Sequence, residues 1–438
     1  MNQQRTSITQ KAAAIVCAAA AFAVLAVGLW HGDSCTLTCL YPDGTSQTYR
    51  TLRGFSPWNL PRPVQEGWTF VGWQDDQGNL LSPGSVKPRE DMTVTAQMAP
   101  ALNTGEHIAY LTPAEQDLFL PDAPLTAGQA EEMLDRLTLI EEEQTFFSQS
   151  PETPVDRQTF LTVLRKLYPA DRMPAVLQDR TDGPLTRGQS VQILNTLLNR
   201  NAGASHTQAQ VGVLPDVPPD HPLYGDMAEA AVSHHCSGDS WTDSTPLPKP
   251  ESGLRQVGLD LLCVGPDGHL VRSGNWGNFQ FDAAGRYTSG MPELDDLVRQ
   301  VLDEILAPDM TPLEQLRAAY DYTVSSFSYL RRNYYQVGET GWGAEEAYTM
   351  LSTGYGNCYS YAATFYELAR ALGFDPVLIS GLVGTDRSPH GWVELELDGV
   401  HYTCDPELEM TYHRDRAYRV PDMFLMPDFM SAEWTYRH

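Results

Sequence analysis

Residues 354–361 read GYGNCYSY, and this stretch decides the fold of the C-terminal part of the chain. The pattern predicts a helix that ends near Gly354 and a second helix that begins at Cys358 and ends at Gly373. The apolar side chains expected on the buried side of the second helix are Tyr361, Phe365, Leu368 and Leu372. Cys358 therefore falls in the first helical turn, where unpaired backbone N–H groups and the helix dipole favour a thiolate. The same N–H groups could hold an oxyanion. A buried structural cysteine is the alternative.

A histidine and an aspartate follow in a predicted β-hairpin. Residues 392–397 are the predicted first strand, Asp398-Gly399 is a two-residue type I′ turn, and residues 400–405 are the second strand, which runs back along the first. This register places Asp405 opposite Trp392, with His390 two positions further on the same face, about 7–8 Å away along the diagonal. The other face should be a core and contains Val393, Leu395, Leu397, Val400, Tyr402 and Cys404. A turn one residue longer or shorter would separate His390 from Asp405.

These three residues suit a thiol catalytic triad. Cys358 would attack an amide carbonyl and form a thioacyl intermediate. His390 would accept the thiol proton and later protonate the leaving amine, and Asp405 would orient the imidazole.

Residues 312–412 resemble the transglutaminase-like superfamily of papain-like thiol enzymes, in particular its bacterial exported members. The resemblance rests on AYTMLSTGYGNCYSYAATFYELARALGFDPVLISG and HGWVELELDGVHYTCDP, and on their order. It implies an α+β fold over residues 291–438 and catalytic roles for Cys358, His390 and Asp405.

The chain departs from the family pattern at two positions. Asn357 stands where cross-linking transglutaminases have glutamine, and Asp405 is followed by Pro406-Glu407, where the family pattern is Asp-Pro-Thr. Trp342 is either a structural residue or part of the lining of the site.

The N-terminus predicts membrane attachment. Residues 12–30 are apolar and uncharged, with Arg5 and Lys11 before them and Asp33 after. Nineteen such residues span about 29 Å as a helix, enough to cross a bilayer. The basic flank places residues 1–11 in the cytoplasm and the bulk of the chain outside the cell, as a single-pass protein of a bacterial surface. The alternative is a cleaved signal peptide.

Charge and cysteine content limit the function classes. The 438 residues carry a net charge of −27, which excludes nucleic acid as the expected partner. Seven cysteines form no dense disulfide framework. No metal or organic cofactor is implied. In particular, His234-His235-Cys236 lacks a second cluster that would complete a zinc site, and we interpret it as a solvated helix end.

Residues 31–100 alternate strand-like runs with turns. The segments GWTFVGW and MTVTAQM resemble the internalin-type B repeat, also called the Listeria-Bacteroides repeat, a small β-grasp-like module. The resemblance implies a spacer or adhesion element with Trp68, Phe70 and Trp73 in its core. A generic small β-domain is the alternative.

Residues 101–250 change to helical periodicity. Three segments recur every 30 residues, with Thr126, Asp156 and Thr186 as N-caps. The segments LTRGQ and LPDVPPDHPLYGDMAEAAVSH resemble S-layer homology modules, which implies cell-wall polysaccharide as a partner. Only Arg157 and Arg187 match the basic position of that family, so a plain helical spacer remains the alternative. Residues 237–253 predict a linker, and residues 251–290 a short β linker.

The sequence therefore predicts a multidomain protein. Its order is a transmembrane helix, a β-repeat, a helical repeat region and a C-terminal α+β thiol enzyme acting on peptide or protein substrates at the cell envelope. Hydrolysis is favoured over acyl transfer. The alternative is a non-catalytic adhesion or wall-binding protein that uses the last domain as a scaffold.

Overall fold

The computed structural model describes residues 19–24, 26–27, 32–57, 60–140, 144–169, 171–415 and 419–438. These divide into two compact units. The first comprises residues up to 114, 120–212 and 219–247, and the second comprises residues 115–119, 213–218 and 248–438. Most of the predicted membrane segment, residues 12–30, lies outside the described residues. Among those described, no helix has both the length and the apolar character needed to span a bilayer.

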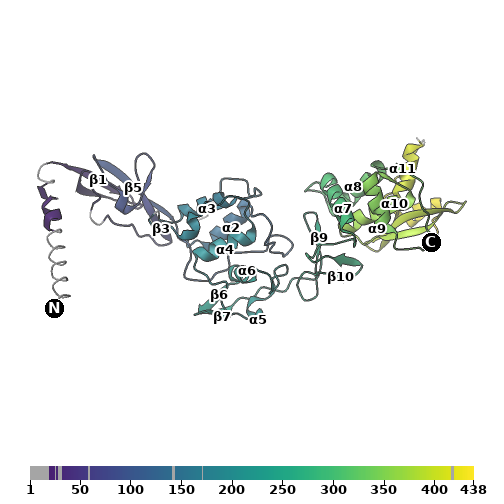
Figure 1. Ribbon diagram of the computed structural model, residues 1–438, viewed down its shortest axis with the longest axis horizontal. Helices are drawn as coiled ribbons and strands as arrows, with labels where there is room; N and C mark the ends of the chain where they lie inside the picture. Colours follow the sequence, from purple (N-terminus) through teal and green to yellow (C-terminus); the bar gives the residue numbers. More distant parts are fainter. Residues whose placement is uncertain are drawn as a thin grey trace, which may run out of the picture. The chain divides into compact units, whose positions relative to one another are not determined.

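A five-stranded mixed sheet occupies the start of the first unit (Figure 1). Its strands are β1 (Ser34–Leu40), β2 (Ser46–Leu52), β3 (Trp68–Gln74), β4 (Leu80–Leu81) and β5 (Met92–Pro100). The order is β2-β1-β5-β3-β4, and β1 pairs with β5 in parallel. Phe70 and Trp73 are buried in its core, whereas Trp68 is only half-buried.

The three repeated helices are present as predicted. They are α2 (Ala127–Leu137), α3 (Arg157–Lys166) and α4 (Arg187–Leu197), and the side chains of Thr126, Asp156 and Thr186 cap them. Isolated bridges join the residues before these helices in a closed ring: Pro124 to Thr186, Thr126 to Pro154, and Asp156 to Pro184. The repeat therefore packs around a local three-fold arrangement.

Two short helices and a hairpin complete this unit. They are α5 (Gln208–Val211), α6 (Tyr224–Ala231), β6 (His234–Ser237) and β7 (Ser240–Ser244). The interpretation of His234-His235-Cys236 as a solvated helix end is wrong, because α6 stops at Ala231 and His234 is buried in β6. Part of the predicted 237–253 linker is likewise the return strand of this hairpin.

The segment predicted as a β linker, residues 251–290, is packed into the second unit instead. It forms two hairpins, β8 (Gly253–Val257) with β9 (Asp260–Val264) and β10 (Gly274–Trp276) with β11 (Phe279–Phe281). Their apolar side chains form a small core. Tyr287, just beyond β11, donates a hydrogen bond to Glu367 at 3.1 Å and so ties this segment to the helical layer.

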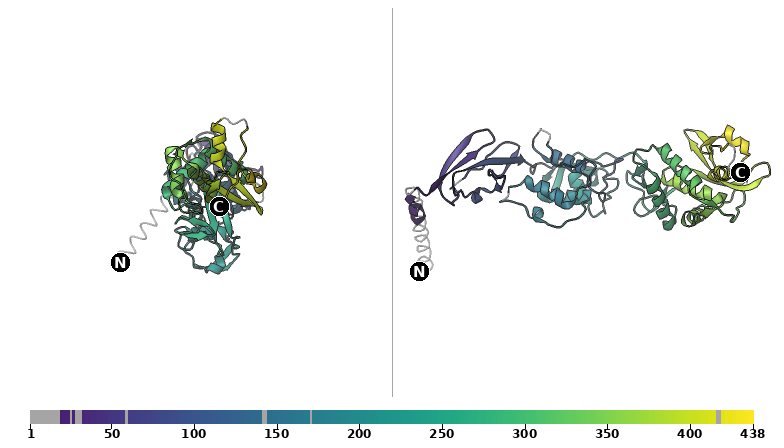
Figure 2. Two further views of the ribbon diagram at one scale, coloured as in Figure 1. Left: turned by 90° about the vertical axis from the view of Figure 1, so that its right-hand side faces the viewer. Right: turned by 90° about the horizontal axis from the view of Figure 1, so that it is seen from above.

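The remainder of the second unit is an α+β domain in which α10 packs against strands of a four-stranded antiparallel sheet (Figures 1 and 2). The sheet order is β14 (Val377–Val383), β15 (Ser388–Leu397), β16 (Val400–Cys404), β17 (Met426–Pro427). The helices are α7 (Pro292–Ile305), α8 (Pro312–Ser325), α9 (Gly343–Thr353), α10 (Cys358–Ala371), α11 (Pro406–Arg414) and α12 (Asp428–Ser431). Strands β12 (Ser328–Tyr329) and β13 (Tyr355–Gly356) pair in parallel beside them.

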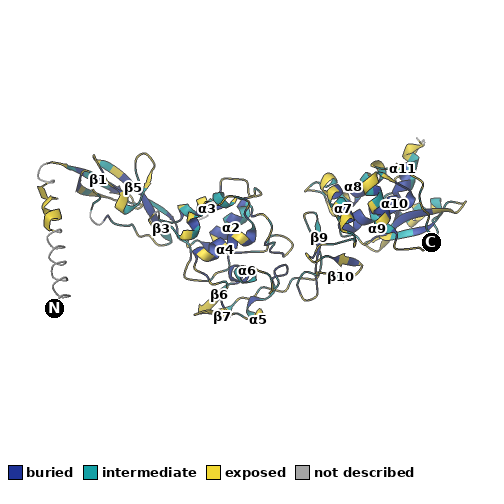
Figure 3. Cartoon of the chain, viewed as in Figure 1, coloured by how far each residue is buried: buried dark blue, intermediate teal, exposed yellow. Residues whose placement is uncertain are grey.

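Helix α10 lies at the centre of this domain. It contacts α7, α8, α9, α11, β14 and β15. All of its residues except Tyr366 are buried, and the helix is largely dark blue in Figure 3. The predicted single apolar stripe is therefore too narrow, because neighbouring elements surround this helix on every side. Small residues such as Ala362 and Ala363 allow that close approach.

Candidate active site

Cys358 begins α10, as the glycine-broken loop before it predicts. Asn357 is the N-cap: its side-chain oxygen accepts the backbone N–H of Ser360 at 3.3 Å. Gly354 ends α9 in the left-handed conformation, with φ of 80°. The thiol is buried, with 3% of the residue exposed. The cysteine is thus held at a helix N-terminus by local capping.

The side chain of Asn357 joins two segments of the protein. Its amide nitrogen donates to the carbonyl oxygen of Asn333 at 2.7 Å, while its oxygen caps the helix. At the position where cross-linking transglutaminases have glutamine, this chain therefore has a side chain that fixes the loop at Asn333 onto the start of α10.

A buried carboxylate holds the same turn from the other direction. The hydroxyl of Ser360 donates to Glu346, which is 2% exposed on α9. Tyr335 donates a second hydrogen bond to Glu346 at 2.9 Å. Nothing in the sequence singles out this network, because Glu346 looks like one more acidic residue of a helix.

The hairpin register is confirmed. Leu397 pairs with Val400 and Val393 with Cys404, and the turn residues Asp398 and Gly399 both have positive φ, 52° and 74°. Val393, Leu395 and Cys404 lie in the main core. The predicted core face is wrong at its far end, where Val400 is exposed, because the hairpin extends beyond the helices there.

Gly391 allows β15 to approach the start of α10. A β-carbon at this position would lie 2.7 Å from Cδ1 and 3.1 Å from the backbone Cα of Tyr359. Only glycine fits so close an approach. Because His390 precedes Gly391 and Cys358 precedes Tyr359, this contact sets the approach of the imidazole to the thiol.

His390 lies between Cys358 and Asp405. Its Nε2 is 2.7 Å from Oδ2 of Asp405, and Cys358 is near enough to raise the pKa of the imidazole. Since Asp405 occupies Nε2, Nδ1 is the nitrogen left for the thiol. His390 and Asp405 are 5% and 0% exposed. The structure thus brings together all three residues that the sequence singled out.

Asp405 has further partners. Its Oδ1 accepts the backbone N–H of Leu408 at 3.0 Å, so that it also caps α11. Its Oδ2 accepts the hydroxyl of Tyr436 at 2.7 Å. Sequence reasoning missed Tyr436, which reaches the site because the C-terminal segment pairs with β14 through Leu382 and Arg437.

The surroundings of His390 stabilise the charged imidazole that forms when it takes the thiol proton. Burial alone would lower the pKa of His390, but the carboxylate of Asp405 and the hydrogen bonds to Asp405 and Cys358 outweigh it and raise that pKa well above its usual range. Glu407 lies nearby, with Oε2 3.9 Å from Nδ1 of His390. Burial raises the pKa of Glu407, although the charge of His390 opposes this.

Two other residues considered in the sequence are structural. Trp342 is buried and stacks on Tyr335, with ring centroids 5.0 Å apart. Cys404 lies in the core, where burial raises its pKa to about 12.

One family model matches the part of the chain that carries these residues. Residues 299–406 match the family model described as "Transglutaminase-like superfamily". The C-terminal part of this chain is a transglutaminase-like domain. This match contains Cys358, His390 and Asp405.

Among solved structures, the chain is similar to one described as a "Putative Cysteine Protease" from Cytophaga hutchinsonii. The identity is 17% and the TM-score 0.21, and the match covers 26% of this chain and 37% of that one. No curated protein matches the chain. The match to this superfamily suggests thiol-enzyme chemistry, which makes a cysteine peptidase or acyltransferase the class to test.

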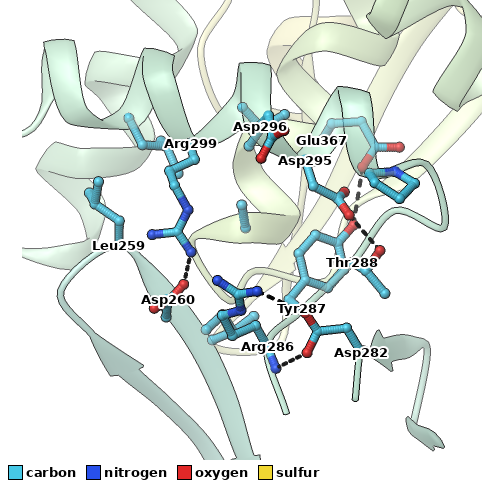
Figure 4. Close-up of a pocket in the computed structure, with 15 residues that line it drawn as sticks. Leu259, Asp260, Asp282, Arg286, Tyr287, Thr288, Asp295, Asp296, Arg299 and Glu367 are labelled. Carbon is cyan, nitrogen blue, oxygen red and sulfur yellow. Dashed lines mark hydrogen bonds and ion pairs between the residues drawn. The ribbon is translucent and has the colours of Figure 1, made fainter. Parts of the chain in front are cut away.

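A separate pocket of about 180 Å³ lies between the β9 hairpin and helices α7 and α10 of the transglutaminase-like unit (Figure 4). Its charged side chains are mostly paired: Arg299 contacts Asp260, and Arg286 contacts Asp282 at 3.3 Å. Cys358, His390 and Asp405 do not line it. We therefore do not assign the chemistry to this pocket.

Replacing Glu367 in this pocket with glutamine is expected to change the pH dependence of stability. Burial raises its pKa from 4.5 to about 7 despite the hydrogen bond from Tyr287. The folded state then holds a proton between about pH 4.5 and 7 that the unfolded state has released, so wild-type stability falls as pH rises through this range. The difference between the folded and unfolded pKa of Glu367 corresponds to about 3 kcal/mol in the free energy of unfolding.

Urea unfolding of the wild type and Glu367→Gln at about pH 5 and about pH 8 measures this effect. Between these two pH values, the free energy of unfolding of the wild type should fall by about 3 kcal/mol more than that of the variant. Glu293→Gln, at an exposed position of α7, is the control. Equal pH dependence of Glu367→Gln and wild type would show that Glu367 does not hold the proton.

Tyr436→Phe is expected to slow the alkylation of Cys358 about tenfold, since it removes one hydrogen bond to a buried carboxylate. Its ring can still pack on Trp392, 5.0 Å away. The measurement is the rate of reaction with iodoacetamide at neutral pH. Tyr412→Phe, which removes a hydroxyl paired with Trp434, is the control. An unchanged rate in Tyr436→Phe would remove this tyrosine from the site.

Proposed function

We propose that this protein is a thiol enzyme of the cell envelope that cleaves or transfers peptide amide bonds through Cys358, His390 and Asp405. The observation that carries the proposal is the placement of His390, whose Nε2 lies 2.7 Å from Oδ2 of Asp405 and whose imidazole lies near Cys358. An imidazole held between a thiol and a carboxylate can move a proton in both directions.

The reaction begins with transfer of the thiol proton from Cys358 to His390. The sulfur then attacks the amide carbonyl carbon and forms a C–S bond, and the carbonyl oxygen becomes an oxyanion. The backbone N–H groups at the start of α10 are the donors available to it. His390 returns its proton to the leaving nitrogen as the C–N bond breaks.

The thioacyl group is released in a second step. His390 removes a proton from water, which attacks the thioester and frees the acid and Cys358. An amine in place of water gives acyl transfer by the same steps. We favour hydrolysis. Because Asp405 accepts from His390, Tyr436 and Leu408, it stays in place throughout both steps.

Side chains near Cys358 support a peptide substrate. Leu330, Tyr334 and Tyr355 are exposed. Leu330 bonds the backbone of Gly356, and Tyr334 contacts the ring of Tyr359 at 6.3 Å, so both lie beside the first turn of α10. Exposed apolar and aromatic side chains at a reactive centre are typical of surfaces that bind extended peptides.

The location at the cell surface is part of the proposal. It rests on the apolar run at residues 12–30 and on its basic flank. Protease accessibility of the transglutaminase-like domain on intact cells tests the location separately from the chemistry. Digestion only after the cells are opened would contradict it.

Site-specific alkylation tests the chemistry without knowledge of the substrate. At neutral pH, iodoacetamide should label Cys358 rapidly in the wild type and slowly in His390→Ala. Cys404 and Cys263 are internal references, because burial raises their pKa values to about 12 and about 11. Cys236 is exposed, so the experiment uses a Cys236→Ser background and peptide mapping. An unreactive Cys358 would overturn the enzyme hypothesis. If Cys358 does react, a library of peptides then identifies the substrate.

A further inference from the structure

Three side chains capable of binding a metal, those of His107, His234 and Cys236, lie with their ligand atoms within 4.8 Å of one another in the first unit, and a fourth, Glu229, contacts both histidines. His107 comes from the extended segment before α2, Glu229 from the last turn of α6, and His234 and Cys236 from β6. Nδ1 of His107 lies 2.5 Å from Oε1 of Glu229, 2.9 Å from Nε2 of His234 and 3.8 Å from Sγ of Cys236. Nε2 of His234 is 3.2 Å from the same Glu229 oxygen.

Backbone contacts fix the segments that carry these groups. His107 and His234 form a β-bridge, with the N–H of His234 donating to the carbonyl of His107 at 3.0 Å. Arg200 donates to the backbone carbonyls of Glu106, Ile108 and Glu229, so its guanidinium joins the segment at His107 to the end of α6. The cluster is therefore built into the fold of this unit.

The imidazole of His234 is oriented for a cation. Its Nδ1 donates to the carbonyl of Val232 at 2.8 Å, which leaves the lone pair of Nε2 directed at the cluster. The ring also stacks on Trp241, with centroids 3.7 Å apart and 13° between the planes. A backbone acceptor on the second ring nitrogen is the arrangement that metal-binding histidines commonly have.

Two imidazole nitrogens, one carboxylate oxygen and one sulfur are a ligand set that suits Zn²⁺. Tetrahedral bonds of about 2.0–2.3 Å place the ligand atoms about 3.3–3.8 Å apart. The distances from Nδ1 of His107 to Glu229, His234 and Cys236 span 2.5 to 3.8 Å, and the two histidines and Cys236 lie within 4.8 Å of one another, so movement of His107 away from Glu229 and of Glu229 toward Cys236 would admit the ion. We propose that His107, Glu229, His234 and Cys236 bind one zinc ion.

Charge and access fit a divalent cation. Glu229 is 1% exposed, and a carboxylate buried to this degree needs positive charge nearby, of which Arg200 supplies a part. Glu229 and a Cys236 thiolate would balance the two charges of the ion, while Arg200 remains bonded to backbone carbonyls. A surface pocket lined by His107, His234 and His235 gives an entry path. The ion would fasten the β6–β7 hairpin to α6 and to the segment at His107.

A network without metal is the competing explanation. In it, a proton on Nδ1 of His107 is shared between Glu229 and His234, and Cys236 takes no part. The two explanations differ at Cys236, which is exposed and can be replaced without disturbing a core. Cys236→Ser is therefore the decisive variant.

The experiment titrates the metal-free full chain with Zn²⁺ in a calorimeter, and with Co²⁺ in a spectrophotometer. We expect one ion per chain, a rise in melting temperature with Zn²⁺, and a thiolate-to-Co²⁺ charge-transfer band. Cys236→Ser should keep the melting temperature of the metal-free protein, abolish the charge-transfer band and weaken Zn²⁺ binding at least tenfold. Glu229→Gln should weaken binding to a similar degree.

Two control variants separate this site from other groups. His235→Ala changes the neighbouring exposed histidine of β6 and should bind Zn²⁺ as the wild type does. Cys358→Ser removes the thiol of the transglutaminase-like domain and should also leave binding unchanged. Absence of Zn²⁺ binding, binding that Cys236→Ser leaves intact, or binding that Cys358→Ser abolishes would each overturn the proposal.

Discussion

Asp405→Asn should slow the alkylation of Cys358 at neutral pH by about 10³-fold, an effect of the size that loss of a general base produces. The carboxylate accepts the proton on Nε2 of His390, which leaves Nδ1 free to accept the thiol proton. An amide can donate to Nε2 instead and so place the imidazole proton on Nδ1, facing the sulfur. In that tautomer His390 cannot act as the base.

The variant should still fold, which keeps its result interpretable. Asn is as good an N-cap as Asp, so the bond to Leu408 at the start of α11 can persist. Asp428→Asn is a matched control, since Asp428 contacts His401 at 2.8 Å in another His–Asp pair, exposed at the surface. It should react as the wild type does. An alkylation rate in Asp405→Asn within threefold of the wild type would show that Asp405 does not set the tautomer.

Trp392→Ala should lower the free energy of unfolding of the transglutaminase-like unit by about 3–5 kcal/mol. This tryptophan is fully buried on the His390 face of the hairpin. It packs against Tyr436 and His438, and its indole N–H donates to Glu394 at 2.8 Å. Removing the ring leaves a cavity and also loosens the C-terminal segment that brings Tyr436 to Asp405.

Chemical denaturation measures the stability loss, and the iodoacetamide rate measures its effect on Cys358. Trp276→Ala is the control. It changes a half-buried tryptophan of β10 and should lower the free energy of unfolding by less than Trp392→Ala does. Slower alkylation of Trp392→Ala under conditions where it is fully folded would connect this packing to the site. A loss of stability no larger than that of Trp276→Ala would show that the indole ring does not support the hairpin.

Local sequence determined much of the transglutaminase-like domain. Gly354 and Asn357 specify where α9 ends and α10 begins, because a left-handed glycine and a capping side chain act over a few residues. The Asp398-Gly399 turn specifies the register of β15 and β16 for the same reason. Cys358 and the facing pair His390 and Asp405 were therefore predictable, together with their order.

Periodicity was less informative where burial is complete. The residues expected in the stripe of α10 are buried, but so are polar residues such as Ser360, Thr364 and Glu367. An amphipathic pattern identifies one buried face, whereas a central helix has several, and only its neighbours reveal this. The segment at residues 251–290 resembles a linker in sequence because its strands are short, although their apolar side chains form a core.

Only the tertiary structure brought distant polar groups together. Tyr436 lies 31 residues after Asp405 in the chain, and it reaches this carboxylate because the C-terminal segment pairs with a strand. Glu346 bonds Ser360 from a separate helix, and His107 meets His234 across 127 residues. The sequence showed His234 and Cys236 but could not show His107 or Glu229 beside them. Turns and caps act between neighbours in sequence, whereas a hydrogen-bond network or a metal site depends on how separate elements pack, which no local pattern encodes.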